Sequence, residues 1–69
     1  MRFVYMVAEA EKPLFSSRKK AEQRVYKILA DWGVTLIGIT RGEFYTHYEY
    51  ENKKEYEKGL IEVVKQIVY

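Results

Sequence analysis

The 69-residue chain contains no cysteine, one histidine and one proline. The absence of cysteine excludes disulfides, thiolate metal sites and a cysteine nucleophile. A lone His47 does not make a histidine-rich metal centre, so we expect neither a metal nor a cofactor. Apolar runs fall far short of the roughly 20 residues that span a bilayer, and the first residues lack the pattern of a signal peptide. These absences predict a soluble, cytoplasmic protein with no membrane partner.

The remaining composition is that of a small globular domain. Hydrophobic residues make up 48% of the chain and charged residues 32%, and 12 basic against 10 acidic side chains give a net charge of +2. No repeat, low-complexity run or linker divides the sequence, so we expect residues 1–69 to form a single domain. A chain of this length buries only about 60% of its unfolded surface, which leaves a thin core.

Residues 18–32 follow the period of an amphipathic helix. Ser16 or Ser17 is a suitable N-cap, and Gly33 stands where a glycine commonly ends a helix. The apolar stripe comprises Ala21, Val25, Ile28, Leu29 and Trp32. We expect Trp32 to lie in the core, so that Trp32→Ala unfolds the domain. The alternative is an exposed tryptophan that acts as a binding hot spot.

Three segments predict strands because they are rich in apolar and β-branched residues. Residues 3–8 are apolar on both alternating faces, residues 34–40 are mostly β-branched, and residues 43–50 alternate between two faces. Arg41 and Gly42 predict a two-residue hairpin turn between the last two segments.

The C-terminal part of the chain predicts a second helix, from about Lys53 to the end. Asn52 and Glu55 have the three-residue spacing of a capping box. The apolar set is wide for one helix and comprises Tyr56, Leu60, Ile61, Val63, Val64, Ile67 and Val68. The element order β-α-β-β-α predicts an α+β fold of two layers, with a three-stranded mixed sheet, its first two strands parallel, and both helices packed on one face.

Positive charge is concentrated in the first half of the chain. Residues 12–27 contain six basic side chains and one acid. A ridge of positive charge on a helix is typical of phosphate contacts, but it is also an ordinary solvated helix face. Both interpretations stay open for the basic stripe, which we define as Arg18, Lys20, Arg24 and Lys27.

No group of residues in the sequence points to catalysis. His47 and Glu49 are ordinary same-face neighbours on a strand, and Ser16 and Ser17 are explained as helix caps. The sequence has no glycine-rich phosphate loop and no metal-ligand spacing. We therefore expect no catalytic residues and a protein that is not an enzyme.

Tyrosine is frequent, with seven residues in a chain too short to bury them all. Tyrosine is favoured at protein interfaces because it combines a large rigid ring with a polar tip. We expect the outer sheet face and the flank of the second helix, which includes Tyr69, to bind another protein. The expected partner-binding residues are Tyr45, Tyr48, Tyr50, Arg41, Ile61 and Val68.

The segment Leu14-Phe15-Ser16-Ser17, with Ala21-Glu22 after it, follows the strand-like residues Val4–Val7. This order of strand, cap and helix start resembles a layout found in small phage and mobile-element proteins. The resemblance covers the first third of the chain and implies a viral origin and a host protein as partner. The expected function is a non-enzymatic, virus-encoded binding protein or inhibitor that acts on a host protein as a homodimer. The alternative is a nucleic-acid-binding module that uses the basic stripe.

Overall fold

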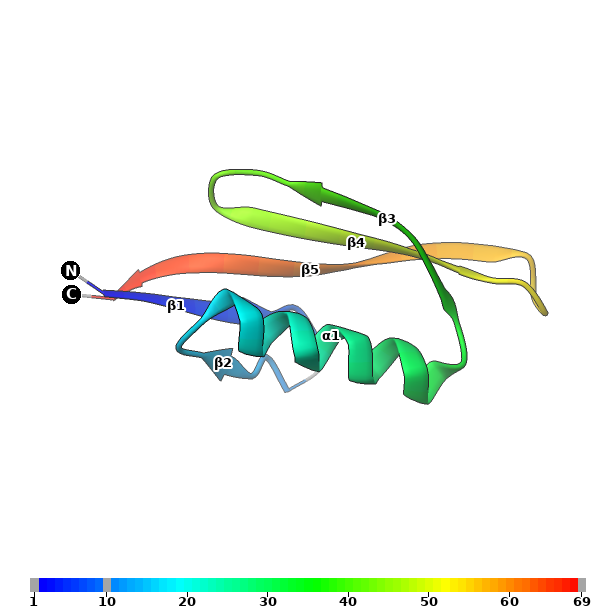
Figure 1. The fold of residues 1–69 in the computed structure, drawn as a ribbon, viewed down its shortest axis with the longest axis horizontal. Helices are drawn as coiled ribbons and strands as arrows, with labels where there is room; N and C mark the ends of the chain where they lie inside the picture. Colours follow the sequence, from blue (N-terminus) through cyan, green and yellow to red (C-terminus); the bar gives the residue numbers. More distant parts are fainter. Residues whose placement is uncertain (1, 10, 69) are drawn as a thin grey trace.

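The computed structural model describes residues 2–9 and 11–68. Within them the chain forms one helix and five strands, in the order β1 (Arg2–Val7), β2 (Leu14–Phe15), α1 (Arg18–Trp32), β3 (Thr35–Arg41), β4 (Tyr45–Asn52) and β5 (Glu57–Val68). The strands make one sheet in the order β2-β1-β5-β4-β3, and every neighbouring pair is antiparallel. Figure 1 shows α1 lying along one side of this sheet.

The helix α1 begins and ends where the sequence predicts. The Ser17 hydroxyl accepts a hydrogen bond from the Lys20 amide at 3.2 Å, which identifies Ser17 as the N-cap. Gly33 ends the helix with φ 67°, a left-handed conformation that glycine adopts without steric cost. Among the described residues, no helix is long and apolar enough to cross a membrane.

The predicted second helix is wrong, and with it the three-stranded mixed sheet, the parallel pair and the layer of two helices. Residues 57–68 form β5, the central strand of the sheet. This segment is rich in β-branched residues, which lose side-chain freedom in a helix and fit a pleated strand. Its wide apolar set belongs to a strand that is apolar on both faces, where Val63 is buried and its neighbour Val64 points the other way.

The turn between β4 and β5 explains the false signal of a helix start at Asn52. The Asn52 side-chain oxygen accepts the Lys54 amide at 3.1 Å, which closes an Asx turn and not a helix cap. The turn before β4 also differs from the prediction, since Arg41 still belongs to β3. The Gly42 amide donates to the Tyr45 carbonyl at 2.8 Å, so the chain reverses two residues later than predicted.

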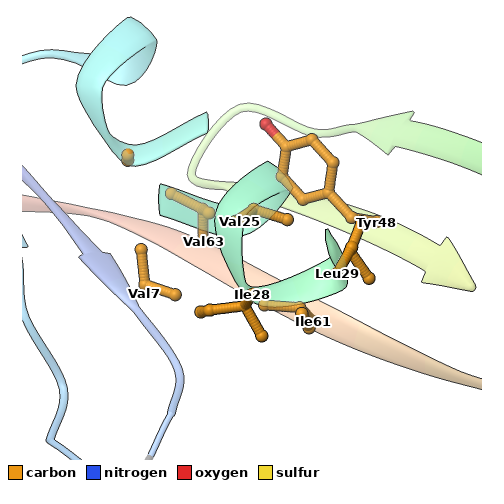
Figure 2. Close-up of a cluster of buried hydrophobic side chains, with 8 residues drawn as sticks. Val7, Val25, Ile28, Leu29, Tyr48, Ile61 and Val63 are labelled. Atoms are coloured by element: carbon orange, nitrogen blue, oxygen red, sulfur yellow. The ribbon is translucent and has the colours of Figure 1, made fainter. Parts of the chain in front are cut away.

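The core lies between α1 and the sheet face that it covers, which we call the covered face (Figure 2). Its buried apolar residues are Val7, Ala21, Val25, Ile28, Leu29, Tyr48, Ile61 and Val63. The prediction that Trp32 belongs to this core is wrong, because its side chain is 54% exposed. The helix packs mainly on β1, β2 and β5. Its last turn brings Trp32 into an edge-to-face contact with Tyr50, with the ring centres 5.7 Å apart.

Candidate functional site

The sheet face opposite α1, which we call the uncovered face, presents a cluster of apolar side chains. Met6, Val64 and Tyr45 are direct cross-strand neighbours on β1, β5 and β4. Their positions alternate with those of the buried core residues, so they point away from the helix. Val4 lies two residues before Met6 on the same face. We call Val4, Met6, Tyr45 and Val64 the tyrosine patch.

Two neighbours hold the Tyr45 ring in place at this patch. The ring is tilted by 33° over the His47 ring, with their centres 4.6 Å apart. It also lies over Gly42, where the Cβ of any other residue would clash with it. Tyr45 remains 42% exposed, so it is a positioned aromatic side chain that is open to solvent.

A polar pair lies beside the patch in the middle of the uncovered face. His47 on β4 is opposite Glu62 on β5, and their side chains meet at 2.5 Å between Nε2 and Oε2. Thr40 is opposite His47 on the other side, but no hydrogen bond joins the two in the described part of the chain. The described residues hold no group of three side chains suited to a metal ion. The pair gives this face a polar centre.

Beyond this pair, the uncovered face becomes apolar again. Ile37 on β3 and Leu60 on β5 are 46% and 52% exposed. They border a shallow cavity of about 290 Å³, whose lining consists of Ile37, Glu49, Tyr50, Lys58, Gly59 and Leu60. Apolar groups thus extend over four adjacent strands, from β1 to β3.

The predicted partner-binding residues are divided between the two faces. Tyr45 lies on the uncovered face, as described. Tyr48 and Ile61 are 0% and 4% exposed in the core, so their prediction as surface anchors needs correction. Strand alternation is the reason, because both occupy covered-face positions, where they are cross-strand partners.

The other predicted residues lie against the core or at strand ends. Tyr50 is partly buried beside Trp32, and Arg41 makes an ion pair with Glu22 at 3.3 Å. Val68 is the last residue of β5 and partly exposed, whereas Tyr69 lies outside the described residues. The prediction missed Val64 and Leu60, because it places them in a helix; an alternating pattern applied to β5 places them both on the uncovered face.

A partly buried hydrogen-bond network joins α1 to the covered face. The Tyr48 hydroxyl donates to the Glu22 carboxylate at 2.9 Å. Burial and this carboxylate raise the pKa of Tyr48. Burial also raises the pKa of Glu22, but the hydroxyls of Tyr48 and Tyr26 and the charge of Arg41 outweigh that effect. The pKa of Glu22 therefore lies below its ordinary value.

The basic stripe lies on α1, on the opposite side of the sheet from the tyrosine patch. Lys20, Arg24 and Lys27 share a groove of about 450 Å³ with Phe15 and other residues. Arg24, however, is in an ion pair with Glu9 at 2.7 Å, and Glu11 also lines the groove. The guanidinium of Arg18 is 5.9 Å from the centre of the Tyr5 ring.

Nucleic-acid binding through both the basic stripe and the exposed tyrosines requires that the two lie on one surface. The sheet separates the stripe from Tyr45, and nearby acids offset part of its charge. The geometry therefore does not favour this alternative.

Comparison with family models, with curated proteins and with solved structures finds no match to the chain. The expectations of a viral origin, an inhibitory role and a homodimer gain no support from the fold or from these comparisons, and they are not carried forward.

Proposed function

We propose that this chain is a non-enzymatic protein-binding domain whose docking surface is the uncovered face of its sheet, with the tyrosine patch as its main anchor. One observation carries the proposal: the helix covers one face of a five-stranded sheet, while the other presents partly exposed apolar side chains from four adjacent strands. Clusters of exposed apolar side chains beside polar groups are typical of protein–protein contact sites. The proposal keeps the sequence-based expectation of a cytoplasmic location.

Tyr45 is the anchor in this proposal. Its ring is held by His47 and Gly42 before any partner arrives, so binding costs little further side-chain entropy. Truncation of a tyrosine anchor that is buried in an interface typically costs about 2 kcal/mol or more of binding free energy. The polar His47–Glu62 pair beside the ring sets the orientation of the partner more than the affinity.

Two serine variants of exposed tyrosines test this proposal. The wild-type chain, Tyr45→Ser and Tyr56→Ser are immobilised and incubated with a lysate of the source cells, and bound proteins are quantified by mass spectrometry. Tyr56 is a matched control because it is 89% exposed in the turn between β4 and β5, away from the patch.

We expect a protein that the wild-type chain and Tyr56→Ser retain and that Tyr45→Ser loses. With that protein purified, Tyr45→Ser should raise Kd about thirtyfold, the equivalent of about 2 kcal/mol. Equal retention by all three chains would refute the tyrosine patch as the docking surface. Circular dichroism of each variant confirms that the fold is unchanged.

A further inference from the structure

Strand β3 has the sequence of a central strand but lies at an edge. Among the described strands it has a neighbour on one side only. Residues 35–40 contain no charge and no proline, and Ile37 and Ile39 on opposite faces are 46% and 39% exposed. Strands that are apolar on both faces are normally covered on both. Edge strands are usually protected by charge, by proline, by a bulge or by being short, as two-residue β2 is at the other edge. β3 has a bulge between Leu36 and Gly38 and a charge at its last residue, Arg41, and residues 38–40 between them carry no such protection.

The free side of β3 presents unpaired backbone groups. The Gly42 amide donates to the Tyr45 carbonyl, so these two residues form a hydrogen-bonded pair. Such pairs alternate with non-bonded pairs along an antiparallel ladder. The register therefore directs the backbone N–H and C=O groups of Ile39 and Arg41 away from β4 and into solvent.

We infer that β3 accepts an extended segment of another protein, which adds a sixth strand to the sheet through the backbone of Ile39 and Arg41. This inference rests on the proposed function and specifies how the partner is held. Strand addition of this kind gives affinity through main-chain hydrogen bonds and specificity through alternate side chains.

The side chains beside β3 define the chemistry of the incoming segment. On the covered face Ile39 offers an exposed apolar surface, which suits a β-branched or aromatic residue. On the uncovered face the Glu49 carboxylate lies over Gly38, where a Cβ would stand 3.4 Å from Oε2. Glu49 makes no ion pair with any other described residue. A lysine or arginine of the segment can reach Glu49 across Gly38, because glycine has no side chain in the way.

A second copy of the chain is a poorer occupant of this edge. β3 carries a bulge between Leu36 and Gly38, close to its middle. Two copies that pair antiparallel through β3 would bring their bulges together and leave ladder hydrogen bonds unmade. A regular extended segment meets only one bulge and pairs with the regular stretch from Gly38 to Arg41.

The test uses a phage-displayed library of linear twelve-residue peptides selected against the folded full-length chain. The probe is the most enriched peptide, made synthetically and titrated into the protein while amide hydrogen exchange is followed by NMR. We expect enriched peptides without proline, with β-branched or aromatic residues at every second position and a lysine or arginine between them. We expect exchange of the Ile39 and Arg41 amides to slow at least about tenfold on binding.

Variants distinguish binding at the edge of β3 from binding at the tyrosine patch. Glu49→Gln should weaken binding of the basic peptides about threefold to fivefold, the effect of one exposed ion pair. Glu55→Gln, in the turn after β4, is the matched control and should leave Kd unchanged. Ile39→Pro, which removes one outward amide, should abolish binding. If that variant fails to fold, the exchange measurement on the wild-type chain still decides whether the peptide pairs with β3.

Three outcomes would overturn the inference. Enriched peptides with helical spacing would do so, as would Ile39 and Arg41 amides that exchange at the free rate in the complex. A dimer in light scattering that loses β3 protection on dilution would assign the edge to a second copy. If Tyr45→Ser abolishes peptide binding while the β3 amides stay unprotected, the edge inference fails and the proposed function stands. If the β3 amides are protected and Tyr45→Ser has no effect on any partner, the proposed function fails and the edge inference stands.

Discussion

Removing the Tyr48 hydroxyl tests the hydrogen-bond network that joins the covered face to α1 at Glu22. Tyr48 is fully buried, and its hydroxyl donates to Glu22 at 2.9 Å. A hydrogen bond to a charged group contributes about 1.5–3 kcal/mol to stability. The Glu22 side chain is 25% exposed and keeps Arg41 at 3.3 Å, so water and Arg41 replace part of the lost bond. We therefore expect Tyr48→Phe to lower the free energy of unfolding by about 1.5 kcal/mol, near the lower limit of this range.

The loss is large for a domain of this size. Domains below about 70 residues rarely have a total free energy of unfolding above about 3–5 kcal/mol. A change of 1 kcal/mol shifts Tm by about 4–8 °C in a domain of 60–100 residues, so we expect a fall of about 6–12 °C. Urea denaturation followed by circular dichroism measures the free energy of unfolding directly, and thermal melts check it.

Tyr56→Phe is the control, because it deletes the same hydroxyl from a side chain that is 89% exposed. It should change the stability by less than about 0.5 kcal/mol. A double-mutant cycle of Tyr48→Phe with Glu22→Gln should give a coupling energy of about 1 kcal/mol. The reasoning would be refuted if Tyr48→Phe were as stable as Tyr56→Phe, or if the two changes in the cycle were additive.

Four further results are expected. Trp32→Ala should leave a folded domain that has lost about 1 kcal/mol in urea denaturation, because Trp32 is already 54% exposed; an unfolded variant would contradict this. Tyr56→Asn should raise stability by about 0.5 kcal/mol, since φ is 54° at this position and asparagine tolerates it; a lower urea midpoint would count against it. Gly42→Ala should displace the tyrosine ring above it and move the NMR resonances of the His47 ring, whereas unchanged resonances would show that the ring is not held there. Because the pKa of Tyr48 is raised in the folded state, the contribution of Tyr48 to stability should be constant below about pH 10 and fall above it as the tyrosine of the unfolded chain ionises; in thermal melts from pH 8 to 11, Tyr48→Phe should lose part of this slope.

The helix α1 could be predicted from the sequence because its signals are local. Ser17 and Gly33 mark its ends, and the spacing of the apolar residues marks its buried face. The burial of Trp32 could not be predicted in this way. Helical spacing places it on the correct side, but whether the last turn still lies over the sheet depends on where the strands end.

The strand β5 shows why the rest of the fold was not predictable from local pattern. Its apolar residues occupy adjacent positions, and that arrangement fits a wide helical face as well as a strand with two apolar faces. The β-branched composition was the better guide. β-Branched side chains lose rotamer freedom in a helix, whereas they pack well on the pleated surface of a strand. Once β5 is a strand, the sheet becomes fully antiparallel and the second helix that would have covered it disappears.

Part of the candidate site followed from the sequence alone. The alternation in β4 places Tyr45 and His47 on one face and Tyr48 on the other, as the structure shows. Which of these faces meets the helix is a tertiary property, and for that reason Tyr48 was assigned to the surface. Tyr45 and Tyr48 are chemically identical, and only their position relative to α1 makes one an exposed ring and the other a core residue.

The uncovered face and the free edge meet at Gly38, and this geometry connects the two proposals. A segment paired with β3 has every second side chain on the uncovered face, next to Glu49 and the cavity beside Ile37. The chain that continues beyond such a segment can cross the sheet toward Tyr45 without leaving that face. A partner that uses both surfaces would cover the apolar groups that one helix leaves exposed, and it would give β3 the neighbour that its sequence favours.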